Sequence, residues 1–254
     1  MDWSQVTALT IPEGSVKQVA VNGVVLWKNR GYTQLEYIES TGTQWIDTEY
    51  VMTSGHFSTF NGNIMWTQSN GTANFFYGYR SVNSAEYRGN MRTFFVYGQS
   101  AGGPAGRLAI RYGVQVDNSS STISQNKKYN ISFDGTNLKV DGETFIYLSN
   151  TYTPAVYRNM YLFYCNCTGY YSADVAKFSG RIYNWQIFED GVLVRDFIPA
   201  MRNSDGEVGL YDTVSKQFFT NAGTGEFIAG LPNDYTQLEN DSDSYIKTGV
   251  HKEI

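Results

Sequence analysis

The sequence has few charged residues and no basic cluster. Charged residues make up 17% of the 254 residues, the formal net charge is −5, and Lys127 and Lys128 form the largest group of lysines. Binding to a phosphate backbone needs concentrated Lys and Arg that release counterions. Acidic membrane surfaces attract polybasic segments for the same electrostatic reason. We therefore expect no nucleic-acid partner and no attachment to an acidic membrane.

Long apolar segments are also lacking. No stretch approaches the roughly 20 apolar residues that a helix needs to span a bilayer. The segment Met1–Gln5 does not begin the basic and then apolar pattern of a secretory signal. We expect synthesis in a cytoplasm and no insertion into a membrane.

Soft metal ligands are scarce, since the chain contains only His56, His251, Cys165 and Cys167. A structural zinc site takes four ligands, mostly Cys and His. One residue separates the two cysteines, so on a strand their side chains would share a face with little freedom to close a ring. We expect packed thiols, and no metal site built from Cys and His.

Glycine and aromatic residues are abundant, with 25 Gly, 20 Tyr and 15 Phe. Tyr and Phe favour the pleated surfaces of strands, and Gly supplies turns. Asn-Gly and Asp-Gly pairs separate short apolar runs throughout residues 32–230, a spacing typical of hairpins and meanders. No window of a dozen residues has helical periodicity. The sequence predicts an all-β domain.

Two segments show the alternation most clearly. Tyr129, Ile131 and Phe133 alternate with polar residues, and Leu138 and Val140 answer them after the Asp134-Gly135 turn. This pattern predicts a hairpin with one buried and one wet face. In the second segment, Tyr183, Trp185 and Ile187 alternate with Asn184 and Gln186. This alternation is typical of a strand, which ends at the Asp190-Gly191 turn.

The first thirty residues differ from the rest and predict a separate β-hairpin arm. Val6–Ile11 is a short apolar run, and Val16–Val21 and Val24–Trp27 flank Asn22-Gly23. Asn-Gly between two apolar runs is the strongest short-range hairpin signal. The polar segment Lys28–Gly31 is suited to a linker.

A partial repeat appears at the other end of the chain. Tyr32–Glu36 recurs letter for letter as Tyr235–Glu239, and Ile46 and Thr48 are echoed by Ile246 and Thr248. About twenty residues follow residue 230, too few for a second sandwich. Residues 231–254 are either the remnant of a second module or its beginning.

Several segments carry a resemblance to a known family: Gly31–Thr48, Gly180–Trp185, Gly191–Ala200, Asn203–Gly206, Gly209–Asp212 and Gly223–Gly225. They resemble the opening and closing parts of concanavalin A-like, laminin G-like modules in structural proteins of tailed phages and prophages. Ile11–Gly14 and Asn22–Trp27 resemble the arms that precede such modules. The resemblance implies a jelly-roll β-sandwich over residues 31–230 and a virion context. It supplies no ligand.

Signatures of catalysis were sought without success. Laminarinase-type hydrolases of this fold carry Glu-x-Asp-x-Glu on one strand, and this spacing does not occur. No acyl-transfer triad or phosphate-binding loop is evident. We expect no enzymatic activity and no cofactor. Calcium at a loop rim would need Asp47, Asp117 or Asp174, but these lie singly in the sequence and are better explained as turn caps.

Aromatic residues are therefore the remaining candidates for ligand binding. Sugar rings pack their C–H faces against Tyr and Trp while polar side chains contact the hydroxyls. The candidates lie in the middle of the chain, where the resemblance is weakest: Trp66, Tyr77, Tyr79, Arg80 and Tyr87. Alternation puts Phe75, Tyr77 and Tyr79 on one face of their strand, but does not say whether that face is core.

Together these observations predict a non-enzymatic phage virion protein, assembled in the bacterial cytoplasm and displayed on the particle surface. The leading hypothesis is that residues 1–30 dock to other virion proteins of the capsid or tail, while the sandwich contacts host-surface glycan, as an oligomer on the particle. The alternative is a decoration protein of purely structural role, whose aromatic surfaces meet other virion subunits.

Overall fold

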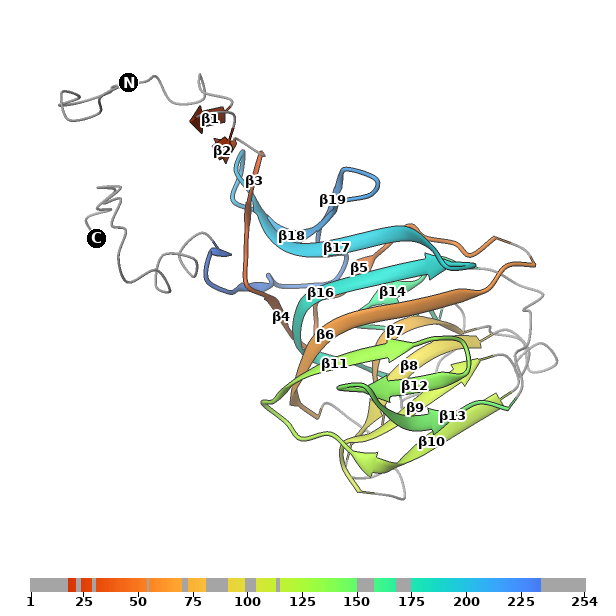
Figure 1. The fold of residues 1–254 in the computed structure, drawn as a ribbon. Coiled ribbons are helices and arrows are strands. Elements are labelled where there is room, and N and C mark those ends of the chain that lie inside the picture. The colour runs from red at the N-terminus through yellow and green to blue at the C-terminus, as the bar shows by residue number, and fades with distance from the viewer. Residues whose placement is uncertain are drawn as a thin grey trace, which may run out of the picture.

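The computed structural model describes residues 18–21, 24–28, 31–53, 55–69, 73–80, 91–98, 104–112, 115–149, 158–167 and 175–233. Every named element in these ranges is a β-strand (Figure 1). None of the described residues forms a helix long and apolar enough to cross a membrane. The all-β prediction is confirmed.

The larger of two sheets, here called the β6 sheet, has a main path of eight strands. Their order is β13 (Glu143–Tyr147), β12 (Asn137–Val140), β11 (Lys128–Phe133), β6 (Ser58–Gln68), β16 (Ser179–Glu189), β17 (Val192–Arg202), β18 (Val208–Asp212) and β19 (Gln217–Phe219). Three more strands join at the side: β3 (Tyr32–Gln34) pairs with β17, while β4 (Ile38–Thr41) pairs with β16 and with β20 (Ile228–Ala229). All these pairs are antiparallel.

The second sheet, here called the β7 sheet, forms the other layer of the sandwich (Figure 1). Its order is β10 (Gln115–Thr122), β9 (Arg107–Tyr112), β8 (Met91–Tyr97), β7 (Ala73–Arg80), β14 (Tyr161–Leu162) and β5 (Ile46–Asp47). The short strand β15 (Val175–Lys177) runs parallel to β7. The two sheets confirm the predicted sandwich.

The predicted hairpin near the N-terminus is also present. Strands β1 (Gln18–Val21) and β2 (Val24–Lys28) pair antiparallel around residues 22–23 and form a two-stranded sheet of their own. The run Val6–Ile11 lies outside the described residues. Docking by this arm stays a prediction, as do the domain boundaries at residues 30 and 230.

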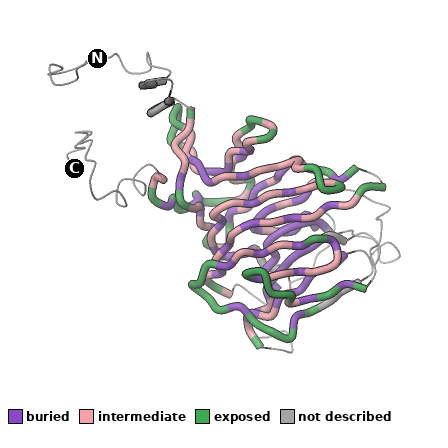
Figure 2. Tube along the Cα trace, viewed as in Figure 1, coloured by how far each residue is buried: buried purple, intermediate pink, exposed green. Residues whose placement is uncertain are grey.

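The core lies between the sheets and is rich in aromatic rings. Along β6, Phe60, Gly62, Ile64 and Trp66 are buried and alternate with partly exposed residues (Figure 2). Trp185 of β16 is fully buried against Phe60, with ring centroids 4.9 Å apart. Burying each such side chain stabilises the fold by roughly 1.5–3 kcal/mol. Each strand of the β6 sheet therefore has one core face and one outer face.

Two irregularities change the expected alternation. In β7, Phe75 pairs with Phe95 and Tyr77 with Phe94, so Phe76 is an extra residue. Phe76 joins Tyr77 and Tyr79 in the main core, while Phe75 belongs to a separate cluster. In β16, Ile182 pairs with Ile64 and Asn184 with Asn63, so Tyr183 is the extra residue. Trp185 and Ile187 are buried as expected, but Tyr183 is partly exposed.

The hairpin around Asp134 has the predicted form. Tyr129, Ile131 and Phe133 of β11 are buried, and so are Leu138 and Val140 of β12. Asp134 accepts hydrogen bonds from the backbone nitrogens of Thr136 and Asn137 and thereby holds the turn. The residues between the buried ones are partly exposed, which confirms the wet face.

Both cysteines and the first copy of the repeat are structural. Cys165 and Cys167 are buried thiols in one small cluster, which agrees with the prediction of packed thiols. In the first copy of the repeat, Tyr32–Gln34 is β3 and Leu35 is 2% exposed. The second copy, Tyr235–Glu239, lies outside the described residues, so its role stays a prediction.

Candidate functional site

The prediction of ligand binding is wrong for three of the five candidate residues. Trp66, Tyr77 and Tyr79 are 2%, 3% and 0% exposed and belong to the main core. The indole nitrogen of Trp66 donates to the backbone oxygen of Gln68, and the Tyr77 hydroxyl donates to the Met160 sulfur. These rings cannot stack on a ligand, because core side chains already cover them. The side chain of Arg80 and all of Tyr87 lie outside the described residues.

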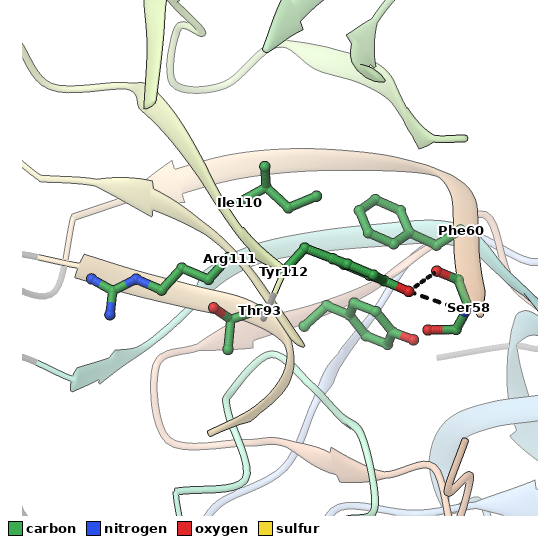
Figure 3. Close-up of a pocket in the computed structure, with 7 residues that line it drawn as sticks. Ser58, Phe60, Thr93, Ile110, Arg111 and Tyr112 are labelled. Atoms are coloured by element: carbon green, nitrogen blue, oxygen red, sulfur yellow. Dashed lines mark hydrogen bonds between the residues drawn. The ribbon is translucent and has the colours of Figure 1, made fainter. Parts of the chain in front are cut away.

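A small cavity opens between the sheets beside one of these core residues, Tyr77 (Figure 3). Its lining is Ser58, Phe60, Tyr77, Thr93, Ile110, Arg111 and Tyr112. The Tyr112 hydroxyl donates to the Ser58 carbonyl at 3.0 Å and accepts from the Ser58 nitrogen at 3.2 Å (Figure 3). The space is about that of one water molecule. A saccharide cannot enter it.

Of the three calcium candidates, only Asp47 has a described side chain. Asp47 accepts hydrogen bonds from the Asn159 side chain at 3.1 Å on both carboxylate oxygens and from the Glu49 backbone nitrogen at 2.9 Å. The side chain of Asp117 and all of Asp174 lie outside the described residues. Within the described part of the chain, no group of three His, Cys, Asp or Glu could hold a metal ion.

The outer face of the β6 sheet offers a different site, built from side-chain amides. Strand alternation turns Asn61 and Asn63 of β6 and Asn130 of β11 away from the core, and Asn184 and Gln186 of β16 join them. All five are partly exposed. We call this set the amide face.

The register arranges the amide face in two rows. Asn63 pairs with Asn184 on one side and with Asn130 on the other, which gives the row Asn184–Asn63–Asn130. Asn61 pairs with Gln186 and with Ser132, which gives the second row. Both rows cross β16, β6 and β11, which run side by side in Figure 1.

The amides hold one another in place. Asn184 Oδ1 accepts from the backbone nitrogen and from Nδ2 of Asn63, at 2.9 and 2.8 Å. Asn130 Nδ2 donates to Asn61 Oδ1 at 3.0 Å, and Gln186 Nε2 donates to Asp196 at 3.1 Å. These bonds orient each side chain, so little conformational freedom remains to be lost when a ligand binds.

Each amide keeps unused hydrogen-bonding capacity. Within the described residues, no hydrogen bond uses Asn184 Nδ2, Asn63 Oδ1, Asn130 Oδ1, Asn61 Nδ2 or Gln186 Oε1. Donors and acceptors therefore lie near one another on one surface. A sugar hydroxyl both donates and accepts, so such a surface matches a polyhydroxylated ligand.

Two tyrosines border the amide face. Tyr183, the extra residue of β16, meets Tyr37 edge to face with centroids 5.6 Å apart. Lys128 Nζ lies 4.0 Å from the Tyr183 ring centre, and the Arg181 guanidinium lies 4.1 Å from that of Tyr37. Burial raises the pKa of Tyr183, so its hydroxyl remains a donor at neutral pH. A bulge thus re-aims an aromatic ring towards a polar surface.

The carboxylates around the amide face are engaged in the protein's own contacts. Glu39 forms an ion pair with Arg181 at 2.7 Å. Asp141 accepts from the Asn130 backbone nitrogen at 2.8 Å, and Asp196 accepts from Gln186 and Thr213. General acid and base catalysis needs carboxylates that reach the substrate. The arrangement is suited to binding.

A second aromatic group lies at the β5 edge of the β7 sheet. The rings of Trp45 and Tyr161 lie 4.3 Å apart, and Tyr164 lies 6.3 Å from Trp45. A Cβ on Gly223 would stand 2.8 Å from Trp45 Cδ1, so the chain also packs closely on this indole. These partly exposed rings pack on one another and on a neighbouring loop.

Sequence reasoning missed the amide face although its signals were present. The alternation identified Asn130, Asn184 and Gln186 as polar positions of strands. Their meeting on one surface depends on the order β16, β6, β11, which joins residues far apart in the sequence. The bulge that exposes Tyr183 leaves no signal in the residue pattern.

Comparisons with known proteins support the fold. No protein-family model and no curated protein sequence matches the chain. A solved structure from Bacteroides ovatus, provisionally described as a carbohydrate-binding protein, matches with a TM-score of 0.54 and 13% identity over 78% of this chain. The match covers 60% of that protein, so the chain spans less than two thirds of its length.

The carbohydrate-binding module CBM66 of Bacillus subtilis matches less well. Its TM-score is 0.30 at 11% identity, with 63% of this chain and 94% of that module covered. A similarity of this size carries no argument. At such low identities the comparisons establish the β-sandwich fold alone.

Proposed function

We propose that the chain is a non-catalytic carbohydrate-binding protein and that the amide face is its saccharide site. The observation that carries the proposal is the set of five oriented side-chain amides with unused donors and acceptors on one surface. Tyr183 and Tyr37 supply the apolar contact that complements such polar groups. The provisional description of the Bacteroides ovatus protein agrees with this reading.

The charges favour a neutral saccharide. Arg181 is balanced by Glu39, and the central positions of the two rows are uncharged. Hydroxyl groups bind to uncharged amides without the desolvation cost that an ion would incur. The surrounding carboxylates are hydrogen-bonded within the protein, which supports binding without catalysis.

The setting that we propose is a phage virion, with the module displayed at the particle surface to adhere to host glycan. This setting rests on the resemblance of Gly31–Thr48, Gly180–Trp185 and Gly191–Ala200 to modules of phage structural proteins. The alternative remains a decoration protein without saccharide binding, as either part of a capsid or part of a tail.

Binding can be measured on the full chain with a glycan array followed by calorimetry. We expect wild-type protein to bind neutral saccharides and Asn184→Ala to lose at least tenfold in affinity, since it removes a donor and the acceptor that orients Asn63. Asn118→Ala is the matched control, because Asn118 is an exposed amide on β10 of the other sheet. Equal binding by the two variants would remove the amide face from consideration.

The virion setting has a separate test. Antibodies against the chain should label intact particles from an induced host culture, and electron microscopy would locate the label on the capsid or tail. Deleting residues 1–30 should abolish that labelling. Labelled particles that bind no host glycan would favour the decoration alternative.

A further inference from the structure

We infer that the amide face takes an extended, neutral polysaccharide chain lying across the strands, with about one sugar ring over each strand. This inference rests on the proposed function and specifies its ligand class. The ligand would be an internal segment of a polymer, in contrast to the terminal sugar of a branched glycan.

The spacing of the row Asn184–Asn63–Asn130 is the first argument. Its members lie directly opposite one another on three neighbouring strands. Adjacent strands lie about 4.7–4.9 Å apart. Successive pyranose rings of an extended, β-linked chain repeat at a similar distance, so each ring can meet one amide of the row.

Both rows also carry polar groups that can bind the hydroxyls of a saccharide chain. Asn184 offers Nδ2 and Asn63 offers Oδ1, and Asn130 then offers Oδ1. The second row adds Gln186, Asn61 and Ser132 on the same three strands. A chain along the rows would therefore meet polar side chains on both sides of every ring.

The shape of the surface also favours an extended chain. The central side chains are short, and they stand on an antiparallel sheet in which β16 is bulged at Tyr183, beside the row. The water-sized cavity lined by Ser58, Phe60 and Tyr112 lies between the sheets, on the core side of β6 and away from the rows. A terminal sugar is usually held in an enclosing pocket, whereas a flat row exposes both ends and lets a chain continue.

The two ends of the row differ chemically. Tyr183 adjoins Asn184 on β16, and exposed Lys128 of β11 covers one face of its ring, with Nζ 4.0 Å from the ring centre. A sugar that stacks there would displace the Lys128 ammonium, and water would then hydrate this group. At the β11 end, Asp141 accepts from the Asn130 backbone nitrogen and closes the row with a polar turn. The first ring should thus bind most tightly at Tyr183.

A length series tests the inference on the full chain. The probes are cello-, xylo-, manno- and chito-oligosaccharides of one to six rings, with affinities measured by calorimetry. In the series that binds, we expect affinity to rise about five- to tenfold per ring up to three or four rings and then level off. Affinity that is the same for one ring as for six would overturn the inference.

Variants at the two ends make the test sharper. Asn130→Ala should remove the gain between two and three rings but leave shorter probes unchanged, whereas Asn184→Ala should weaken every length. Because Asn130 also bonds Asn61, Asn130→Ser is a second variant, and both need thermal melts close to wild type. Asn118→Ala should match wild type throughout. Weakening of all lengths by Asn130→Ser would contradict the ring-per-strand arrangement.

Failure of the two proposals can be told apart. Binding without length dependence keeps the saccharide function and rejects the extended-chain ligand. If none of the probes and no array glycan binds, the proposed function itself fails and the inference fails with it.

Discussion

The outer faces of the two sheets have opposite chemistry. On the β7 sheet, a cluster separate from the main core contains Ala73, Phe75, Phe95, Ala109, Cys165 and Cys167. Phe75 stacks on Phe95 at 4.6 Å, and both are buried at 2% and 0% exposure. On the β6 sheet, the outer face carries amides that are all partly exposed. The apolar cluster on one outer face is buried, and the amide face on the other is partly open to solvent.

The difference shows how one sandwich divides its tasks between two surfaces. The apolar side chains of this cluster gain stability from burial, and the buried rings of Phe75 and Phe95 are not available to a ligand. Polar side chains on the β6 sheet add little stability, because water competes for their hydrogen bonds. They can exchange water for ligand hydroxyls for the same reason. Variants on the first surface should therefore change stability, and variants on the second should change binding.

The largest effect is expected for Phe95→Ala. The side chain is fully buried against Phe75 and lies under Arg111, whose guanidinium is 5.3 Å from the ring centre. Truncating a buried Phe costs about 3–5 kcal/mol. Urea unfolding followed by fluorescence would measure the loss, and the folded fraction should bind saccharide normally. A loss below 1 kcal/mol would show that this cluster is not a second core.

A smaller loss is expected for Gly62→Ala, which links the core to the amide face. A Cβ at this position would lie 2.4 Å from Trp185 Cε3 and 2.6 Å from the Asn184 carbonyl oxygen. Overpacking of this kind costs about 1–3 kcal/mol. Because β16 must shift away from β6, Asn184 should move and saccharide binding should weaken too. Unchanged stability together with unchanged binding would contradict the close approach of these strands.

Local patterns predicted much of the β6 sheet and less of the β7 sheet. Period-two alternation located the hairpin of Ile131 and Val140, because a sheet with one wet face records its register in the sequence. In β7 both faces are apolar, so Phe75 and Phe76 could not be assigned to a side by their residue types. The ligand prediction failed there because the sequence does not distinguish a buried tyrosine from one that binds a ligand.

The stability that the Asp134 turn adds to the β6 sheet should depend on pH. Hydrogen bonds from Asn137, Thr136 and Lys139 outweigh the opposing effect of burial and lower the Asp134 pKa from 3.8 to about 2. The folded pKa lies below the unfolded one, so the carboxylate stabilises the fold above about pH 4, and this contribution is lost as the pH falls towards 2. Asp134→Ala should cost about 1 kcal/mol at pH 7. Melting temperatures of the two proteins should converge near pH 2.

The smallest change in stability is expected at the centre of the amide face. Asn63→Ala removes one hydrogen bond between part-buried side chains, to Asn184 Oδ1 at 2.8 Å, and leaves the backbone bond from Asn63 intact. The cost should be about 0.5 kcal/mol, since solvent replaces the lost partner. Saccharide affinity should nevertheless fall about tenfold, because Asn63 lies between Asn184 and Asn130. Thermal melts and calorimetry on one sample separate the two effects. A large loss of stability without a loss of affinity would mean that these amides serve the fold, as the phenylalanines of the β7 sheet do.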